Sequence, residues 1–313
     1  MLGYVARRLA MAVATVFAAV LITFLLVHAG SGSPGAVVAG PGASAAEIHA
    51  ENEALGWNRP LIVQFGSLLG NLVHFDLGTS LIDGRDIASD LFDRLPVTAS
   101  IAIMATLASG IVGILIGVAA AVRGGRTGKV VNAGAGVALS LPAFWVAILI
   151  VYFLSIQTNL FPATGYVPFS QDPGAWASSL VLPVLTLTIG GAAIIARTAY
   201  AGLREALGQE HIRTLRAVGT PEWRIRYVHA LRFAAVPVVS VLGIQFIALF
   251  GGSVFVENVF AMYGLGQSAQ AAALSHDFPA LISVVVVATV VVVVTNLLLD
   301  LLIAALDPKV RTA

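Results

Sequence analysis

The chain has 313 residues, of which 58% are hydrophobic and only 11% are charged. Soluble domains are roughly one quarter charged, so this composition indicates a membrane protein. The formal net charge of +1 excludes a globally basic nucleic-acid-binding protein. Because the sequence has no cysteine, it also excludes disulfides, thiolate metal sites and a cysteine nucleophile.

Six apolar runs are long enough to cross about 30 Å of hydrocarbon as helices. They lie at about 9–29, 97–122, 130–156, 180–199, 233–256 and 279–305. The sequence therefore predicts an all-α polytopic membrane protein with six transmembrane helices. Residues 1–29 form a tail and the first span, residues 30–95 an insertion, and residues 96–313 a core holding the other five spans.

The first span follows Arg7 and Arg8 and is longer than the apolar stretch of a secretory signal, so we expect a retained anchor rather than a cleaved peptide. With the N-terminus inside, all of the 17 lysines and arginines except Arg59, Arg85 and Arg94 are cytoplasmic. Because basic residues favour the cytoplasmic side during insertion, both termini are predicted to be cytoplasmic.

The insertion at 30–95 is predicted to be a small helical cap on the outer side. Ser44 and Glu47 have the spacing of a capping box, Pro60 suits the start of a second helix, and Ile87 with Leu91 fits a third. The apolar run 61–75 is too short to cross the membrane and is interrupted by polar residues, so we expect it outside the bilayer. The acidic residues of the insertion fit either a docking surface or a solvated face.

No motif for catalysis or metal binding is recognised. The segment "RGGRTGKV" at 123–130 lacks the glycine spacing of a phosphate-binding loop, and the six histidines form no HExxH pair. Ser275, His276 and Asp277 are sequence neighbours, whereas a catalytic triad is assembled from converging side chains. If ATP drives this protein, its hydrolysis belongs to another polypeptide.

Polar residues within the spans have two interpretations each. Asn296 and Asp300 lie on one face of the last span, where a buried structural pair with an arginine of the neighbouring loop is favoured over a proton relay. Gln245 fits a polar pathway as well as a hydrogen bond between helices. Prolines within helical runs often mark bends that line a pathway. The candidate pathway-lining residues are Gln245, Phe246, Trp145 and Pro142.

Small residues on three spans have the spacing that allows helices to cross closely. They are Gly110, Gly113, Gly117, Ala120, Gly134, Gly136, Gly190 and Gly191.

The cytoplasmic segment "HIRTLRAVGTPEWRIRYVHALR" at 211–232 carries five arginines. It reads as helix, turn, helix: the first helix runs over 197–217, Gly219 suits its C-terminal cap, and Thr220 suits the N-cap of a helix that starts at Pro221. Basic segments bind phosphates, lipid headgroups or proteins. The interleaved Leu215, Val218, Trp223 and Ile225 favour a partly buried helix that docks on a protein.

Here the sequence resembles the permease subunits of bacterial ATP-binding-cassette importers, in the branch that takes up dipeptides, oligopeptides and nickel. "HIRTLRAVG" and "HALRFAAVPV" are similar to the cytoplasmic coupling loop of that family. The resemblance extends over nearly the whole chain, through "LSLPAFWVAILIVYFLS", "FPATGY", "GGSVFVENVFAMYGLG" and "NLLLDLLIAALDPKVR". The Glu-Ala-Ala of the broader importer signature is replaced by Arg213, Thr214 and Leu215 before Gly219.

The resemblance implies a type I importer permease with the MetI-like fold, in the bacterial inner membrane. It implies a second homologous permease, two ATPase subunits that hold ATP and Mg, an external substrate-binding protein, and no cofactor in this chain. The loop at 200–232 would contact an ATPase. The residues of this candidate coupling loop are Arg213, Thr214, Arg216, Ala217, Gly219, Glu222, Arg224, His229 and Arg232.

Three alternatives stay open at this stage. The substrate implied by the resemblance is a dipeptide or oligopeptide, with nickel, glutathione or haem as the other candidates. An autonomous secondary transporter or channel would work without ATPase partners. In a third alternative the protein is tethered to the membrane and uses its basic loop to bind nucleic acid or lipid headgroups.

Overall fold

The computed structural model describes residues 2–30 and 32–306, with side chains described for 6–30 and 32–299. Every regular element in that part of the chain is a helix, and one isolated bridge joins Thr79 to Asp86. The chain forms two compact units, the first from Met1–Pro96 and Tyr263–Thr295, the second from Val97–Met262 and Asn296–Ala313. Helices α5 (Ile87–Arg123) and α13 (Phe278–Leu306) each have residues in both units.

The first unit contains the start of α5, most of α13 and five complete helices. The complete helices are α1 (Leu2–Ala29), α2 (Pro34–Ala39), α3 (Ala45–Ala54), α4 (Leu61–Val73) and α12 (Leu265–Ser275). The capping box of α3 is confirmed, because the Ser44 hydroxyl accepts the Glu47 N–H and the Glu47 carboxylate accepts the Ser44 N–H. Pro60 is the N-cap of α4, as the sequence predicts.

A stack of rings forms the core of the first unit. The His28 imidazole stacks on Trp57 with ring centroids 4.0 Å apart, and Trp57 stacks on Phe278 at 5.4 Å. Val27 and Ile282 are buried beside this stack. The outer end of α1, the insertion and the start of α13 therefore share one hydrophobic cluster.

One expectation for this unit is corrected, and one helix was missed. Ile87 and Leu91 do not form a helix of their own, because they lie in the first turns of α5, which continues through Pro96 into the second span. Both side chains are buried. A proline costs little in the first turn of a helix, where the N–H groups have no intrahelical partners. Pro96 lies later, in the third turn, and α5 nevertheless continues through it. The sequence also gave no indication of α12.

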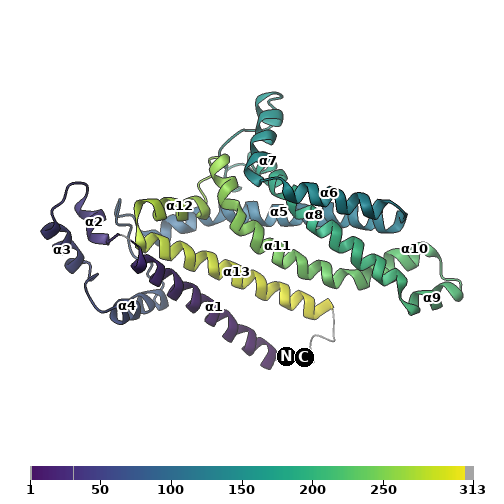
Figure 1. Cartoon of the computed structure of the whole chain (residues 1–313), viewed down its shortest axis with the longest axis horizontal. Helices are drawn as coiled ribbons and strands as arrows, with labels where there is room; N and C mark the ends of the chain where they lie inside the picture. The colour runs from purple at the N-terminus through teal and green to yellow at the C-terminus, as the bar shows by residue number, and fades with distance from the viewer. Residues whose placement is uncertain (1, 31, 307–313) are drawn as a thin grey trace. The chain divides into compact units, whose positions relative to one another are not determined.

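The second unit is a bundle of long helices with a hairpin at one end. Its elements are α6 (Thr127–Ser140), α7 (Ala143–Ile150), η1 (Val151–Ile156), α8 (Pro173–Gly208), α9 (Glu210–Ala217), α10 (Glu222–Arg224), η2 (Ile225–Ala230) and α11 (Leu231–Val259). In Figure 1, α9 and α10 lie beyond the ends of α8 and α11.

The third of the six predicted spans is not one continuous helix. By length and composition five described helices can cross a membrane, and a sixth span is counted only if α6 and the helix formed by α7 and η1 are taken together. These two segments meet at a bend of 91°. Leu141 has extended backbone at the bend because the ring of Pro142 excludes the helical conformation from the residue before it.

The close helix crossing predicted from small residues is confirmed for α5 and α8. A Cβ atom on Gly113 would collide with Ile195, and one on Gly117 would collide with the backbone of Ala196 and with Ala199. Gly134, Gly136 and Gly190 have no described neighbour within 4 Å of that position, so they do not serve this crossing.

Candidate functional site

The predicted basic hairpin starts with a break that the sequence did not reveal. We expected one helix over 197–217, but α8 ends at Gly208 and α9 begins at Glu210. Gln209 between them has extended backbone with ψ 153, which interrupts the helical hydrogen bonds. The eight residues of α9 therefore form a separate helix.

Gly219 ends α9 in a Schellman motif. The N–H of Gly219 donates to the Arg216 carbonyl and the N–H of Thr220 donates to the Leu215 carbonyl, both at 3.0 Å. Gly219 has φ +81, a backbone conformation that residues with a side chain rarely adopt. The predicted glycine cap is therefore confirmed, and it sets the reversal between the two arms of the hairpin.

The second arm starts one residue later than expected. Pro221 is the N-cap of α10 and Glu222 its first helical residue, whereas the sequence predicted Thr220 and Pro221. Pro221 has extended backbone with ψ 141, which places it just outside the helix. The arm then passes through the π-helix η2 into α11, so it is continuous with the fifth span.

Glu222 joins the two arms. Its carboxylate accepts a hydrogen bond from Arg216 Nε at 2.7 Å and another from Arg226 Nε at 3.0 Å. The Arg216 hydrogen bond is the main cause that lowers the pKa of Glu222 from its ordinary value, and Arg226 adds to it. The carboxylate is exposed, so this bridge shapes the turn more than it stabilises the fold.

The inner face of the hairpin packs on the bundle. Ile212 of α9 and Ile225 of η2 are fully buried against Leu203 of α8 and Ala121 of α5. Leu215 is partly buried in the same cluster. The hairpin is therefore held as a rigid extension of the bundle through apolar contacts made by both arms.

The outer face of the hairpin combines cations with apolar side chains. Val218 and Trp223 are 71% and 63% exposed, so two of the four interleaved apolar residues point away from the bundle. Arg213 and Arg224 are exposed, and their guanidinium groups form no hydrogen bond or ion pair within the described part of the chain. The remaining candidate residues Thr214, Ala217 and Arg232 are exposed and His229 is partly buried.

The candidate pathway residues differ in burial. Gln245 and Phe246 of α11 are buried inside the bundle, and Gln245 lies beside Gly191 of α8 and near the buried hydroxyl of Ser109. Trp145 and Pro142 are exposed at the bend between α6 and α7. Of the predicted buried pair, Asn296 is partly buried, and the side chain of Asp300 lies outside the described residues.

A buried carboxylate in the second unit was missed. Glu257 of α11 is fully buried and accepts hydrogen bonds from Thr98 Oγ1 at 2.7 Å and Ser253 Oγ at 3.0 Å. It is the one acidic residue in the sequence of α11, and that isolation was the signal available.

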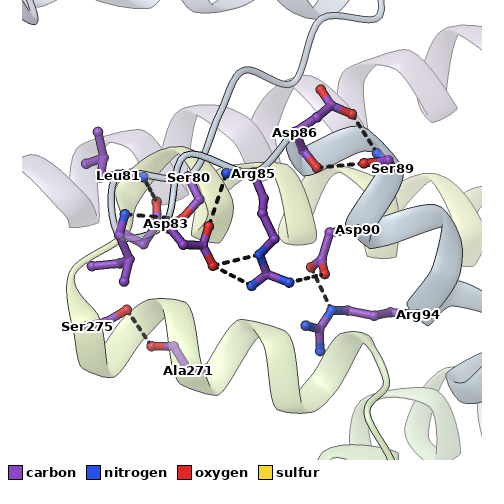
Figure 2. A network of polar contacts seen from close by, with 12 residues as sticks. Ser80, Leu81, Asp83, Arg85, Asp86, Ser89, Asp90, Arg94, Ala271 and Ser275 are labelled. Carbon is purple, nitrogen blue, oxygen red and sulfur yellow. Dashed lines mark hydrogen bonds and ion pairs between the residues drawn. The ribbon is translucent and has the colours of Figure 1, made fainter.

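An outer cleft of about 350 Å³ lies in the first unit between the loop after α4 and α12. Figure 2 shows Arg85 between Asp83 and Asp90, with Arg94 on the other side of Asp90. The hydrogen bond to the backbone N–H of Arg85 is the main cause that lowers the pKa of Asp83. The charges of the cleft are therefore largely paired with one another.

Comparison with known proteins assigns the chain to a family. Residues 113–312 match the family described as binding-protein-dependent transport system inner membrane component, and residues 1–102 match the N-terminal region of such membrane components. The chain belongs to this family. It is thus a non-catalytic, multi-pass permease subunit of an inner-membrane importer, and the ATPase and the binding protein of the transport system are separate partners.

Relatives align with this permease over nearly the whole of both chains. A permease protein of Brucella abortus is 36% identical over 312 residues, 99% of each chain. The probable peptide ABC transporter permease protein y4tP of Sinorhizobium fredii is 33% identical over 98% of this chain and 99% of its own. The glutathione transport system permease protein GsiC of Escherichia coli is 32% identical over 99% of each chain.

A solved structure supports the fold of the permease. A chain in inward-facing conformations of the MetNI methionine ABC transporter aligns with a TM-score of 0.57 at 19% identity, covering 69% of this permease and 96% of that chain. At this identity the similarity concerns the fold alone, and it shows the MetI-like arrangement of helices.

Proposed function

We propose that this permease carries peptides across the inner membrane and is driven through its 200–232 hairpin by an ATPase subunit. The observation that carries the proposal is the two-sided hairpin, in which buried Ile212 and Ile225 fix the segment to the bundle while Arg213, Arg224 and Trp223 remain exposed. A rigid hairpin transmits a push from a partner to the helices on which it packs.

The hairpin arginines have two different roles in this proposal. Arg216 and Arg226 are engaged by Glu222 and shape the turn, so they are less available to a partner. Arg213 and Arg224 are exposed without an ion pair in the described residues, which leaves their guanidinium groups able to bind carboxylates or backbone carbonyls of an ATPase. Trp223 adds an apolar anchor of the type that often dominates binding energy.

A second, similar permease completes the translocation pathway in this proposal. The bend at Pro142 leaves Phe144 and Trp145 exposed on a helix that is apolar throughout. A single chain therefore presents an unfinished surface there, which fits contact with a second permease or with the pathway between the two. Two ATPases, one under each permease, complete the assembly.

Charge reversal in the hairpin tests its coupling to the ATPase subunits. We expect Arg213→Glu combined with Arg224→Glu to release the ATPase subunits and to abolish ATP-dependent uptake of a labelled dipeptide in proteoliposomes. Arg126→Glu is the matched control, because Arg126 is an exposed cytoplasmic arginine in the turn before α6. Retention of the ATPases and of uptake by the double variant would contradict the proposal.

The substrate class rests on the relatives. The proteins from Brucella abortus and Sinorhizobium fredii are named for peptide transport, and GsiC is named for glutathione, which is itself a tripeptide. Competition against labelled dipeptide by unlabelled dipeptide, longer peptide, glutathione, nickel chelate or haem in the complete complex tests it. Inhibition by nickel chelate or haem alone would reject a peptide importer.

A further inference from the structure

Helix α4 has three distinct faces. Phe65, Leu68 and Leu72 form the face that packs on the protein, together with Gln64. Ile62, Gly66, Leu69 and Val73 form an apolar stripe beside it, at the spacing of one helix face. Ser67, Asn71 and His74 form a polar stripe on the other side. The sequence of α4 contains no Asp, Glu, Lys or Arg.

The packed face lies against the outer half of a membrane span. Phe65 contacts Phe17 and Phe24 of α1, with ring centroids 5.7 Å and 5.2 Å apart. Gln64 Oε1 accepts a hydrogen bond from His28 Nε2 at 3.0 Å, and Gln64 Nε2 donates to the carbonyls of Trp57 and Arg59. Figure 1 shows α4 beside the end of α1, with which it shares a unit.

The position of Phe17 gives the depth of this contact. The candidate span of α1 is Ala6–Ala29, and Phe17 lies near its middle. At 1.5 Å per residue, Phe17 is about 18 Å from the outer end of the span. A helix that reaches Phe17 through Phe65 therefore lies within the outer leaflet rather than above the membrane.

The apolar stripe of α4 is exposed at both ends, and Leu69 between them is half-buried. Ile62 and Val73 are 81% and 75% exposed, and Phe75, which follows the helix, is 89% exposed. Ile22 and Leu26 of α1 are exposed as well, on the side of that helix away from Phe17. Exposed large apolar side chains on a helix that packs along a membrane span are typical of contact with acyl chains.

We propose that α4 is an in-plane helix embedded in the outer leaflet, with its apolar stripe on lipid acyl chains and its polar stripe toward the headgroups. The run 61–75 is too short to cross the bilayer, but a short helix with separate apolar and polar stripes can lie in the interface. This placement replaces the expectation that the run lies outside the bilayer. It anchors the middle of the insertion to lipid and leaves α3 in water.

Single-cysteine labelling tests the proposal directly, because the natural chain has no cysteine. Ile62→Cys and Val73→Cys would each be spin-labelled in the complete complex in lipid nanodiscs. Leu26→Cys on exposed α1 is the lipid control and Ala50→Cys on exposed α3 is the aqueous control. Collisions with oxygen, which partitions into lipid, and with a water-soluble nickel chelate are measured for each label.

We expect labels at 62 and 73 to collide with oxygen as the label at 26 does, and to be shielded from the nickel chelate. A label at Asn71, on the polar stripe of the same helix, should collide more often with the nickel chelate than either. Nickel accessibility at 62 and 73 equal to that at 50 would show a solvated helix and overturn the proposal. Shielding of 62 and 73 from both reagents would show that a protein covers the stripe and would overturn it equally.

Discussion

The hydroxyl of Thr98 donates a hydrogen bond of 2.7 Å to the fully buried carboxylate of Glu257, 159 residues further along the chain. The contact joins the start of the second span to the outer end of the fifth within the second unit. Nearby, the N–H of Gly165 donates to the Phe260 carbonyl and Ser100 lies 3.3 Å from the Tyr166 hydroxyl. Polar contacts thus hold this end of the bundle together.

Replacing Thr98 with valine is expected to destabilise the bundle while preserving the shape of the side chain. A buried carboxylate that loses one donor is left partly unsatisfied, at a cost on the order of 1–3 kcal/mol. The measurement is the midpoint of thermal unfolding of the purified complex. Thr106→Val on the same helix is the control, because that hydroxyl bonds only to the Ala102 carbonyl four residues earlier. Equal midpoints for both variants would contradict the prediction.

Replacing Gly219 with valine is expected to uncouple the ATPase subunits. The left-handed backbone at Gly219 costs a residue with a side chain about 1–2 kcal/mol, more for a branched one, so the Schellman turn is lost or redirected. Gly208→Val is the control, since Gly208 ends α8 without positive φ and has no described neighbour within 4 Å of an added Cβ. Co-purification of the ATPases and ATP-dependent uptake are measured. If Gly219→Val and Gly208→Val lost ATPase binding and uptake alike, the turn at Gly219 would not be the cause of the loss.

The hairpin is expected to loosen in acid. The pKa of Glu222 is lowered below its ordinary value of 4.5 by its hydrogen bond to Arg216, so its stabilising contribution is complete above that value. The contribution is lost as pH falls below 4.5 and through the lowered pKa, when the carboxylate becomes protonated. Hydrogen exchange of residues 215–226 between pH 5 and pH 3.5 measures this, after correction for intrinsic rates. In the Glu222→Gln variant the amides of residues 215–226 should exchange fast at both pH values. Exchange in the wild-type protein that does not change with pH would exclude the effect.

Adding one methyl group at Gly117 is expected to force α5 and α8 apart. An added Cβ collides with the backbone of Ala196, which cannot move aside as a side chain does, and such overpacking costs about 1–3 kcal/mol. Gly190→Ala is the control because its Cβ would meet no described atom within 4 Å. The unfolding midpoint of the complex should fall for Gly117→Ala and stay constant or rise for Gly190→Ala.

The cap at Gly219 was predictable because it depends on local chemistry: a glycine after a helical pattern and before a proline. The capping box at Ser44 was predictable for the same reason. The break at Gln209 was missed although Gly208 precedes it, because Gly208 lacks the positive φ of a glycine cap, and α9 is then held by the burial of Ile212 in the bundle. The bend at Pro142 was suggested by the proline, but its 91° is a property of the packed structure.

The sequence alone determined that the chain crosses the membrane in long helices and that its arginine hairpin lies in the cytoplasm, because apolar length and the placement of basic residues act locally. Only the tertiary structure decided which hairpin arginines Glu222 engages, that Glu257 is buried beside Thr98, and that α4 lies along α1. Those relationships join residues that are distant in sequence or on separate arms, and they depend on packing that no local pattern encodes.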